Sequence, residues 1–105
     1  MGSGSSFVNP LMQNWISQYE PRAGVSISYL STGSGKGVDN LLAGACHFAC
    51  SDAPLTTAQR EAAQARSGEI LHLPLAMGAV VAAYNLPGEP ALRFTGPLLA
   101  EIYTE

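Results

Sequence analysis

The sequence predicts an α/β fold with a mostly parallel sheet flanked by helices. Segments with helical and with strand periodicity alternate along the chain, and Gly/Ser-rich loops separate them. Two segments, 46–50 and 77–84, are apolar at nearly every position. Such strands are typical of parallel sheets that helices cover on both faces. With 105 residues, the chain is long enough for one domain at most.

Composition excludes several classes of protein. The formal net charge is −3, and charged residues make up only 12% of the chain. Nucleic-acid binding is not expected, because no basic stripe is available to neutralise phosphates. Hydrophobic residues reach 47%, which argues against intrinsic disorder. No apolar run is long enough for a membrane span, and no signal-peptide pattern follows Met1.

The first helix is expected to begin at Asn9-Pro10, since asparagine is a good N-cap and proline is favoured at the first helical position. Proline disfavours helical geometry in the residue before it, so Pro21 predicts an end near Glu20. Alternating apolar residues and serines then predict a strand over 25–29.

A Gly/Ser loop over 31–37 is expected to lead into a short helix from Val38 to Leu42. Residues 46–50 predict a short buried strand. Thr56 and Gln59 have the spacing of a capping box, which predicts a helix to about Arg66.

Further along the chain, residues 70–75 are expected to be extended, and residues 77–84 to form a long apolar strand. A turn or linker is expected over 85–90. The last helix is predicted from Leu98 to about Tyr103.

Ligands of parallel α/β sheets bind beyond the carboxyl ends of the strands, near helix N-termini. The loops over 31–37 and 51–54 are expected at that edge, and Ser5-Ser6-Phe7 is a third candidate. Hydroxyls and free backbone N–H groups at the start of a helix favour an anion. Ser34 stands in a glycine-rich stretch, where the backbone can approach a ligand closely.

Asp52 is unusual beside an anion site, because a carboxylate repels an anionic ligand. It is useful where the ligand carries a proton that the carboxylate can accept, as phosphate does near neutral pH and sulfate does not. The alternative reading is structural: Asp52 before Ala53-Pro54 also fits an ordinary turn, and Gly/Ser loops often serve only as turns.

Other chemistries find little support in the sequence. A nucleotide P-loop needs glycine at position 30 and serine or threonine at 37, where Leu30 and Gly37 stand. Cys46 and Cys50 would lie about 13 Å apart in a strand, so neither a shared metal nor a disulfide is expected. We therefore expect two small buried thiols, with no metal and no cofactor.

Several motifs resemble the phosphate-binding proteins of phosphate ABC transporters. The resemblance covers essentially the whole chain, and the run Ser51-Asp52-Ala53-Pro54-Leu55 is its most specific part. The other matching segments are Gly4-Ser5-Ser6-Phe7 with Pro10, Trp15 and Tyr19, Thr32 to Val38, Met77 to Gly88, and Ile102-Tyr103.

The resemblance implies a two-lobed, periplasmic or otherwise extracytoplasmic binding protein, not an enzyme, that delivers phosphate to a membrane permease. Ser6 and Phe7 would match the first anion loop, with a hydroxyl and a backbone N–H. Ser34 would match the hydroxyl donor of the second loop. Asp52 would match the carboxylate that accepts the phosphate proton.

Residues 1–86 would form the core of the first lobe in truncated form, and 87–105 the linker and first helix of an incomplete second lobe. Nothing here matches the arginine and the Ser-Gly-Thr loop that close over phosphate in the family. Lys36 stands where the family has a glycine, so it adds a positive charge to the second anion loop.

Two other functions are weighed against phosphate binding. A truncated or designed α/β fragment would expose a sheet edge and self-associate without useful phosphate affinity. An enzyme acting on phosphate esters has the least support, because no nucleophile–base pair is evident in the sequence.

Overall fold

The computed structural model describes residues 1–88 and 91–104. In chain order its elements are β1 (Gly2–Gly4), α1 (Asn9–Ala23), β2 (Tyr29–Ser31), α2 (Ser34–Leu42), β3 (Phe48–Cys50), α3 (Thr57–Ser67) and α4 (Gly96–Thr104).

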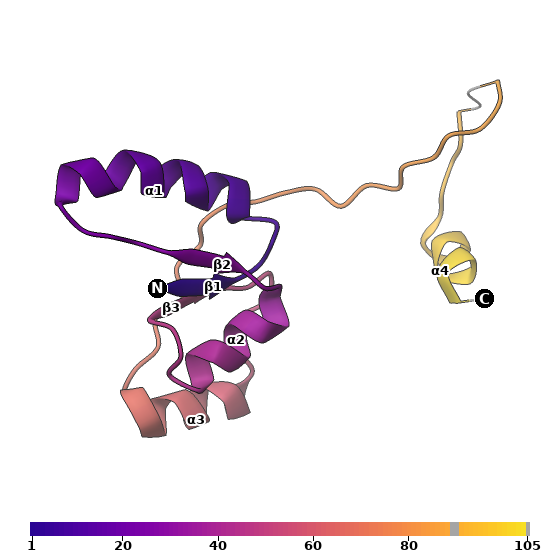
Figure 1. The fold of residues 1–105 in the computed structure, drawn as a ribbon. Helices are drawn as coiled ribbons and strands as arrows, with labels where there is room; N and C mark the ends of the chain where they lie inside the picture. The colour runs from indigo at the N-terminus through magenta and orange to yellow at the C-terminus, as the bar shows by residue number, and fades with distance from the viewer. Residues whose placement is uncertain (89–90, 105) are drawn as a thin grey trace.

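The three strands form one parallel sheet in the order β2-β1-β3, which confirms the predicted α/β class. Gly4, the last residue of β1, is in register with Ser31 on one side and with Cys50 on the other. All three strands therefore end at the same edge, and the loops that follow them leave the sheet side by side (Figure 1).

Helices cover both faces of this sheet. α1 lies on one side, whereas α2 and α3 lie on the other (Figure 1). The core beneath α1 consists of four buried residues, Val8, Met12, Tyr29 and Cys50, and Leu11, Ile16 and Phe48 pack against them.

α2 packs directly on the backbone of β1. A Cβ added at Gly37 would collide with the Gly4 backbone, and a Cβ added at Gly4 would collide with that of Cys50. Only glycine permits such a close approach at these two positions. This packing fixes the start of α2 at the edge where the strands end.

Two boundaries in the first half differ from the expectation. α1 continues through Pro21 to Ala23, where the N–H of Gly24 closes the helix on the Glu20 carbonyl. Pro21 lies in the last turn, so its missing N–H removes only one backbone hydrogen bond there. The expected strand over 25–29 is wrong except for Tyr29, the first residue of β2. Pairing with β1 starts only at the Ser28 carbonyl, which accepts the Gly2 N–H.

α2 starts at Ser34, four residues before the expected Val38. Gly33 makes the turn with φ 85°, so the Gly/Ser loop becomes helical immediately afterwards. The capping box at Thr56 and Gln59 is confirmed, and α3 starts directly after it.

The expected strands over 70–75 and 77–84 are wrong. The structure shows no strand between α3 and α4 among the described residues, and Met77 and Val80 are fully exposed. Their apolar pattern fits burial on two faces, but none of the described helices or strands covers them. The segment does touch the folded part, since His72 Nε2 accepts the Leu55 N–H at 3.2 Å.

The expected last helix is confirmed as α4, which lies apart from the sheet at the end of the extended segment (Figure 1). The radius of gyration is 18.5 Å, against about 13 Å for a compact chain of this length. Residues 89–90 of the expected linker are outside the described residues. None of the described helices is long and apolar enough to cross a membrane.

We predict that Gly37→Ala destabilises the fold by about 1–3 kcal/mol, because its methyl group would push α2 away from β1. Gly35→Ala on the same helix is the matched control, since a Cβ there meets no atom within 4 Å. It should be neutral or stabilise by up to about 1 kcal/mol. Urea unfolding measures both, and equal free energies of unfolding for the two variants would refute the close approach.

Candidate anion-binding site

Two serine hydroxyls meet the Asp52 carboxylate at the edge where the strands end. Ser5 Oγ donates to Asp52 Oδ1 at 2.9 Å, and Ser34 Oγ donates to Asp52 Oδ2 at 2.6 Å. Each of the three residues follows a different strand of the sheet. The parallel register therefore brings together groups that lie 47 and 18 residues apart.

The backbone of Ser5 is fixed on both sides. Its N–H donates to the Cys50 carbonyl at 2.8 Å, and its own carbonyl accepts the Tyr29 hydroxyl at 2.9 Å. Only 3% of Ser5 is exposed, although it is polar. The bond to Asp52 satisfies its hydroxyl, as burial of a polar group requires.

Ser34 is positioned by the turn between β2 and α2. The N–H groups of Thr32 and Gly33 both donate to the Gly4 carbonyl, at 3.1 and 2.9 Å. This pair of bonds ties the loop to the end of β1 and sets Ser34 as the first residue of α2. Ser34 is only partly buried, so its hydroxyl remains open to solvent on one side.

The N-termini of α1 and α2 carry no side-chain cap, whereas α3 is closed by its own capping box. The first N–H groups of a helix have no partner within the helix and bear its partial positive charge. Both uncapped helices begin at the strand-end edge of the sheet (Figure 1). The N-terminus of α2 therefore lies at the exposed Asp52 carboxylate, since Ser34 is the first residue of α2 and donates to it.

Hydrogen bonds from Ser34, and secondarily from Ser5, lower the pKa of the Asp52 carboxyl below its ordinary value. Burial is the main cause that raises the pKa of Tyr29, and it also raises that of the Cys50 thiol. At neutral pH the negative charge of this cluster is therefore that of Asp52, in the form that can accept a proton or a hydrogen bond.

Of the residues that the sequence predicts for the site, Ser34 and Asp52 are in direct contact. Ser6 and Phe7 lie in the loop between β1 and α1, with both side chains exposed. The sequence places Ser5 in a candidate loop but assigns the hydroxyl of that loop to Ser6, whereas in the structure it is Ser5 that contacts Asp52. The register of the strands is the feature that distinguishes Ser5, because Ser5 directly follows β1 just as Asp52 closely follows β3.

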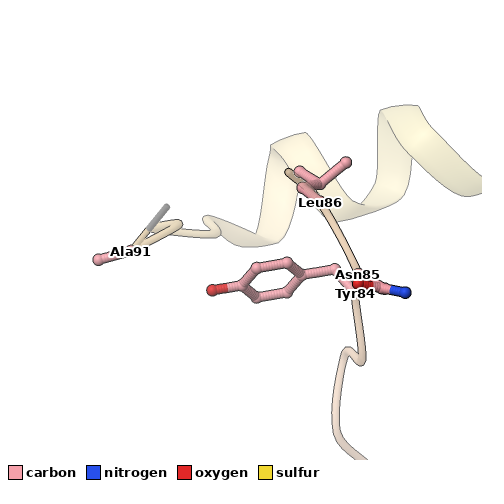
Figure 2. A pocket seen from close by; sticks show the side chains of 4 residues that line it. All are labelled: Tyr84, Asn85, Leu86 and Ala91. Carbon is pink, nitrogen blue, oxygen red and sulfur yellow. The ribbon is translucent and has the colours of Figure 1, made fainter. Parts of the chain in front are cut away.

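Both cysteines are buried free thiols, as expected. Among residues 1–88 and 91–104, no group of three His, Cys, Asp or Glu side chains could hold a metal ion. Figure 2 shows a pocket elsewhere, in the stretch before α4. Its lining residues, none of which belongs to the Asp52 cluster, are Tyr84, Asn85, Leu86 and Ala91.

Comparison with known proteins places this geometry in a family. The model of the PBP superfamily domain matches residues 1–105. The chain belongs to the PBP superfamily. The predicted lobe of a periplasmic-binding-protein fold is thereby confirmed. None of the solved structures matches the chain significantly.

Within this superfamily, the chain is similar to several curated phosphate-binding proteins. The chain is 42% identical to the phosphate-binding protein PstS of Xylella fastidiosa strain 9a5c, over 97% of the chain and 27% of that protein. It is 35% identical to PstS of Haemophilus influenzae, over 97% of the chain and 30% of the relative. It is 32% identical to PstS3 of Mycobacterium bovis BCG, over 96% of the chain and 28% of the relative.

The chain thus spans less than a third of the length of these relatives. All three are named as phosphate-binding proteins, not as enzymes, which agrees with the family resemblance and with the expectation of a non-enzymatic protein.

The lowered pKa of Asp52 predicts how stability changes in acid. A lowered carboxyl pKa stabilises the fold fully above the unfolded-state pKa, and this contribution is lost as pH falls through the folded-state pKa. We expect Asp52→Asn to flatten the stability curve in acid, below about pH 5.

Asp39→Asn is the control, because this exposed carboxyl on α2 lacks the serine donors that bind Asp52. Urea unfolding over the pH series measures all three proteins. An Asp52→Asn curve with the wild-type slope would contradict the hydrogen-bonded carboxylate.

Proposed function

We propose that this chain binds hydrogen phosphate as part of the substrate-binding protein of an ABC phosphate uptake system. The observation that carries the proposal is the Asp52 carboxylate, held by two serine hydroxyls at the sheet edge where two helices without side-chain caps begin. The names of the relatives support the same ligand.

In the proposed complex, the P–O–H group of hydrogen phosphate donates to Asp52. Its remaining oxygens accept hydrogen bonds from the hydroxyls of Ser6 and Ser34 and from the backbone N–H of Phe7. Each hydrogen bond to a charged partner contributes roughly 1.5–3 kcal/mol. The partial charges of the two helix N-termini offset part of the repulsion between Asp52 and the anion.

The same arrangement disfavours sulfate, which is fully deprotonated near neutral pH. A sulfate oxygen facing Asp52 would place two acceptors together with no hydrogen between them. The resulting repulsion is a cost that phosphate avoids, so one carboxylate separates two anions of the same shape.

The proposal extends to the part played by the chain within the whole protein. Residues 1–86 would form the core of one lobe, and residues 87–105 the linker and first helix of the second. We infer an extracytoplasmic location and delivery of phosphate to a membrane permease. Lys36, exposed in the first turn of α2, would add attraction for the incoming anion.

Isothermal calorimetry of phosphate against sulfate tests the proposal. The chain should release heat with phosphate at neutral pH and much less with sulfate. Asp52→Asn should reduce the preference for phosphate roughly tenfold or more, because the amide no longer repels sulfate. Equal heats for both anions, or a sulfate affinity unchanged by the substitution, would rule out the proton-acceptor role.

A second function, self-association without useful phosphate affinity, is favoured by the extended segment 71–86. Its large apolar side chains are exposed in the described structure, notably Leu71, Leu73, Met77, Val80 and Val81. Exposed apolar segments of high β-propensity pair with sheet edges. The partner in this alternative is a second copy of the chain.

Light scattering with and without phosphate separates the two functions. Self-association predicts an oligomer that does not depend on phosphate, and Val80→Asp should shift it toward monomer. Gln64→Asp adds the same charge on the exposed face of α3 and should leave the mass unchanged. A monomer in all samples excludes the alternative, while an oligomer without binding heat excludes phosphate binding by this chain.

A further inference from the structure

We propose that Ser5 is a positioning residue, the permanent hydrogen-bond donor that holds Asp52 in place while Ser34 turns from Asp52 to the bound anion. This inference rests on the proposed phosphate site. It gives different roles to two serines that make the same kind of bond in the structure.

Each serine hydroxyl has a single hydrogen to donate. Ser34 Oγ uses its hydrogen on Asp52 Oδ2 at 2.6 Å, so it cannot donate to a phosphate oxygen at the same time. When the P–O–H group arrives, it donates to the carboxylate in place of Ser34. The Ser34 hydrogen rotates to a phosphate oxygen, so Asp52 accepts the same number of hydrogen bonds as before, and each hydrogen stays on its own oxygen.

The Ser5 hydroxyl, in contrast, is buried, so it cannot rotate toward a ligand in the same way. Ser5 is 3% exposed, its N–H is bound to Cys50, and its carbonyl is bound to Tyr29. The buried hydroxyl would lose its partner by leaving Asp52 Oδ1, and an unpaired buried hydroxyl is costly. Ser34, partly exposed at a helix start, has a new acceptor as soon as the anion arrives.

No described lysine or arginine forms an ion pair with Asp52, so the neutral hydroxyls of Ser5 and Ser34 stabilise its charge. The titratable groups packed around the cluster are Tyr29 on β2 and Cys50 on β3, both buried, and Lys36 is the exposed cation of α2. Once Ser34 has turned away, Ser5 is the protein hydroxyl that still orients the carboxylate toward the phosphate proton.

The first test measures the pKa of Asp52 by carboxyl-carbon NMR in the 105-residue chain without phosphate. Ser5→Ala should raise it, and Ser5→Cys, which keeps a weaker donor at the same place, should give an intermediate value. Ser26→Ala, at an exposed serine in the loop before β2, should leave it unchanged. An unchanged pKa in a folded Ser5→Ala variant overturns the proposal, whether or not phosphate binds.

The second test uses calorimetry with inorganic phosphate and sulfate. Ser5→Ala should lower the ratio of phosphate to sulfate affinity roughly three- to tenfold without weakening sulfate, because Ser5 acts only through Asp52. Ser34→Ala should weaken both anions, because Ser34 touches the ligand itself.

Equal losses for both anions in Ser5→Ala would assign Ser5 to direct ligand contact and refute the positioning role. If the wild-type chain binds neither anion, the proposed function fails, and the turning of Ser34 fails with it. The pKa measurement still decides whether Ser5 holds Asp52.

Discussion

Parallel pairing of β1 between β2 and β3 is the constraint on which the rest of the structure depends. The register aligns Gly4 with Ser31 and Cys50, so three loops leave the sheet at one edge. Those loops supply one hydroxyl from the end of β1, one from the start of α2, and one carboxylate after β3. A shift of register in any strand would separate these groups.

Glycine at two positions allows the close backbone contacts on which this arrangement depends. Gly37 lets α2 lie against the backbone of β1, which carries Ser34 to the carboxylate, and Gly4 lets β1 lie close to the backbone of Cys50 on β3. The core beneath α1 acts on the opposite face, where Tyr29 both fills space and binds the Ser5 carbonyl. The same side chain therefore packs in the core and orients the site, so the geometry of the site depends on correct packing of the fold.

The sequence predicted the features that local chemistry determines. Strand-ending loops identified Ser34 and Asp52, and the capping box identified the start of α3. Ser6 was chosen over Ser5 because the neighbouring serines of this loop look equivalent until the register of β1 is known. Residues 77–84 were predicted as a strand because their pattern fits burial, yet strand formation also needs a partner, and the described elements provide none.

The most direct test of the central claim is a crystal structure of the chain with inorganic phosphate. The account predicts a tetrahedral anion with one oxygen about 2.5–2.7 Å from an Asp52 carboxylate oxygen, and with Ser34 Oγ turned from Asp52 to the anion. An anion bound elsewhere, or bound while both serines still donate to Asp52, would contradict the recognition of phosphate through its proton.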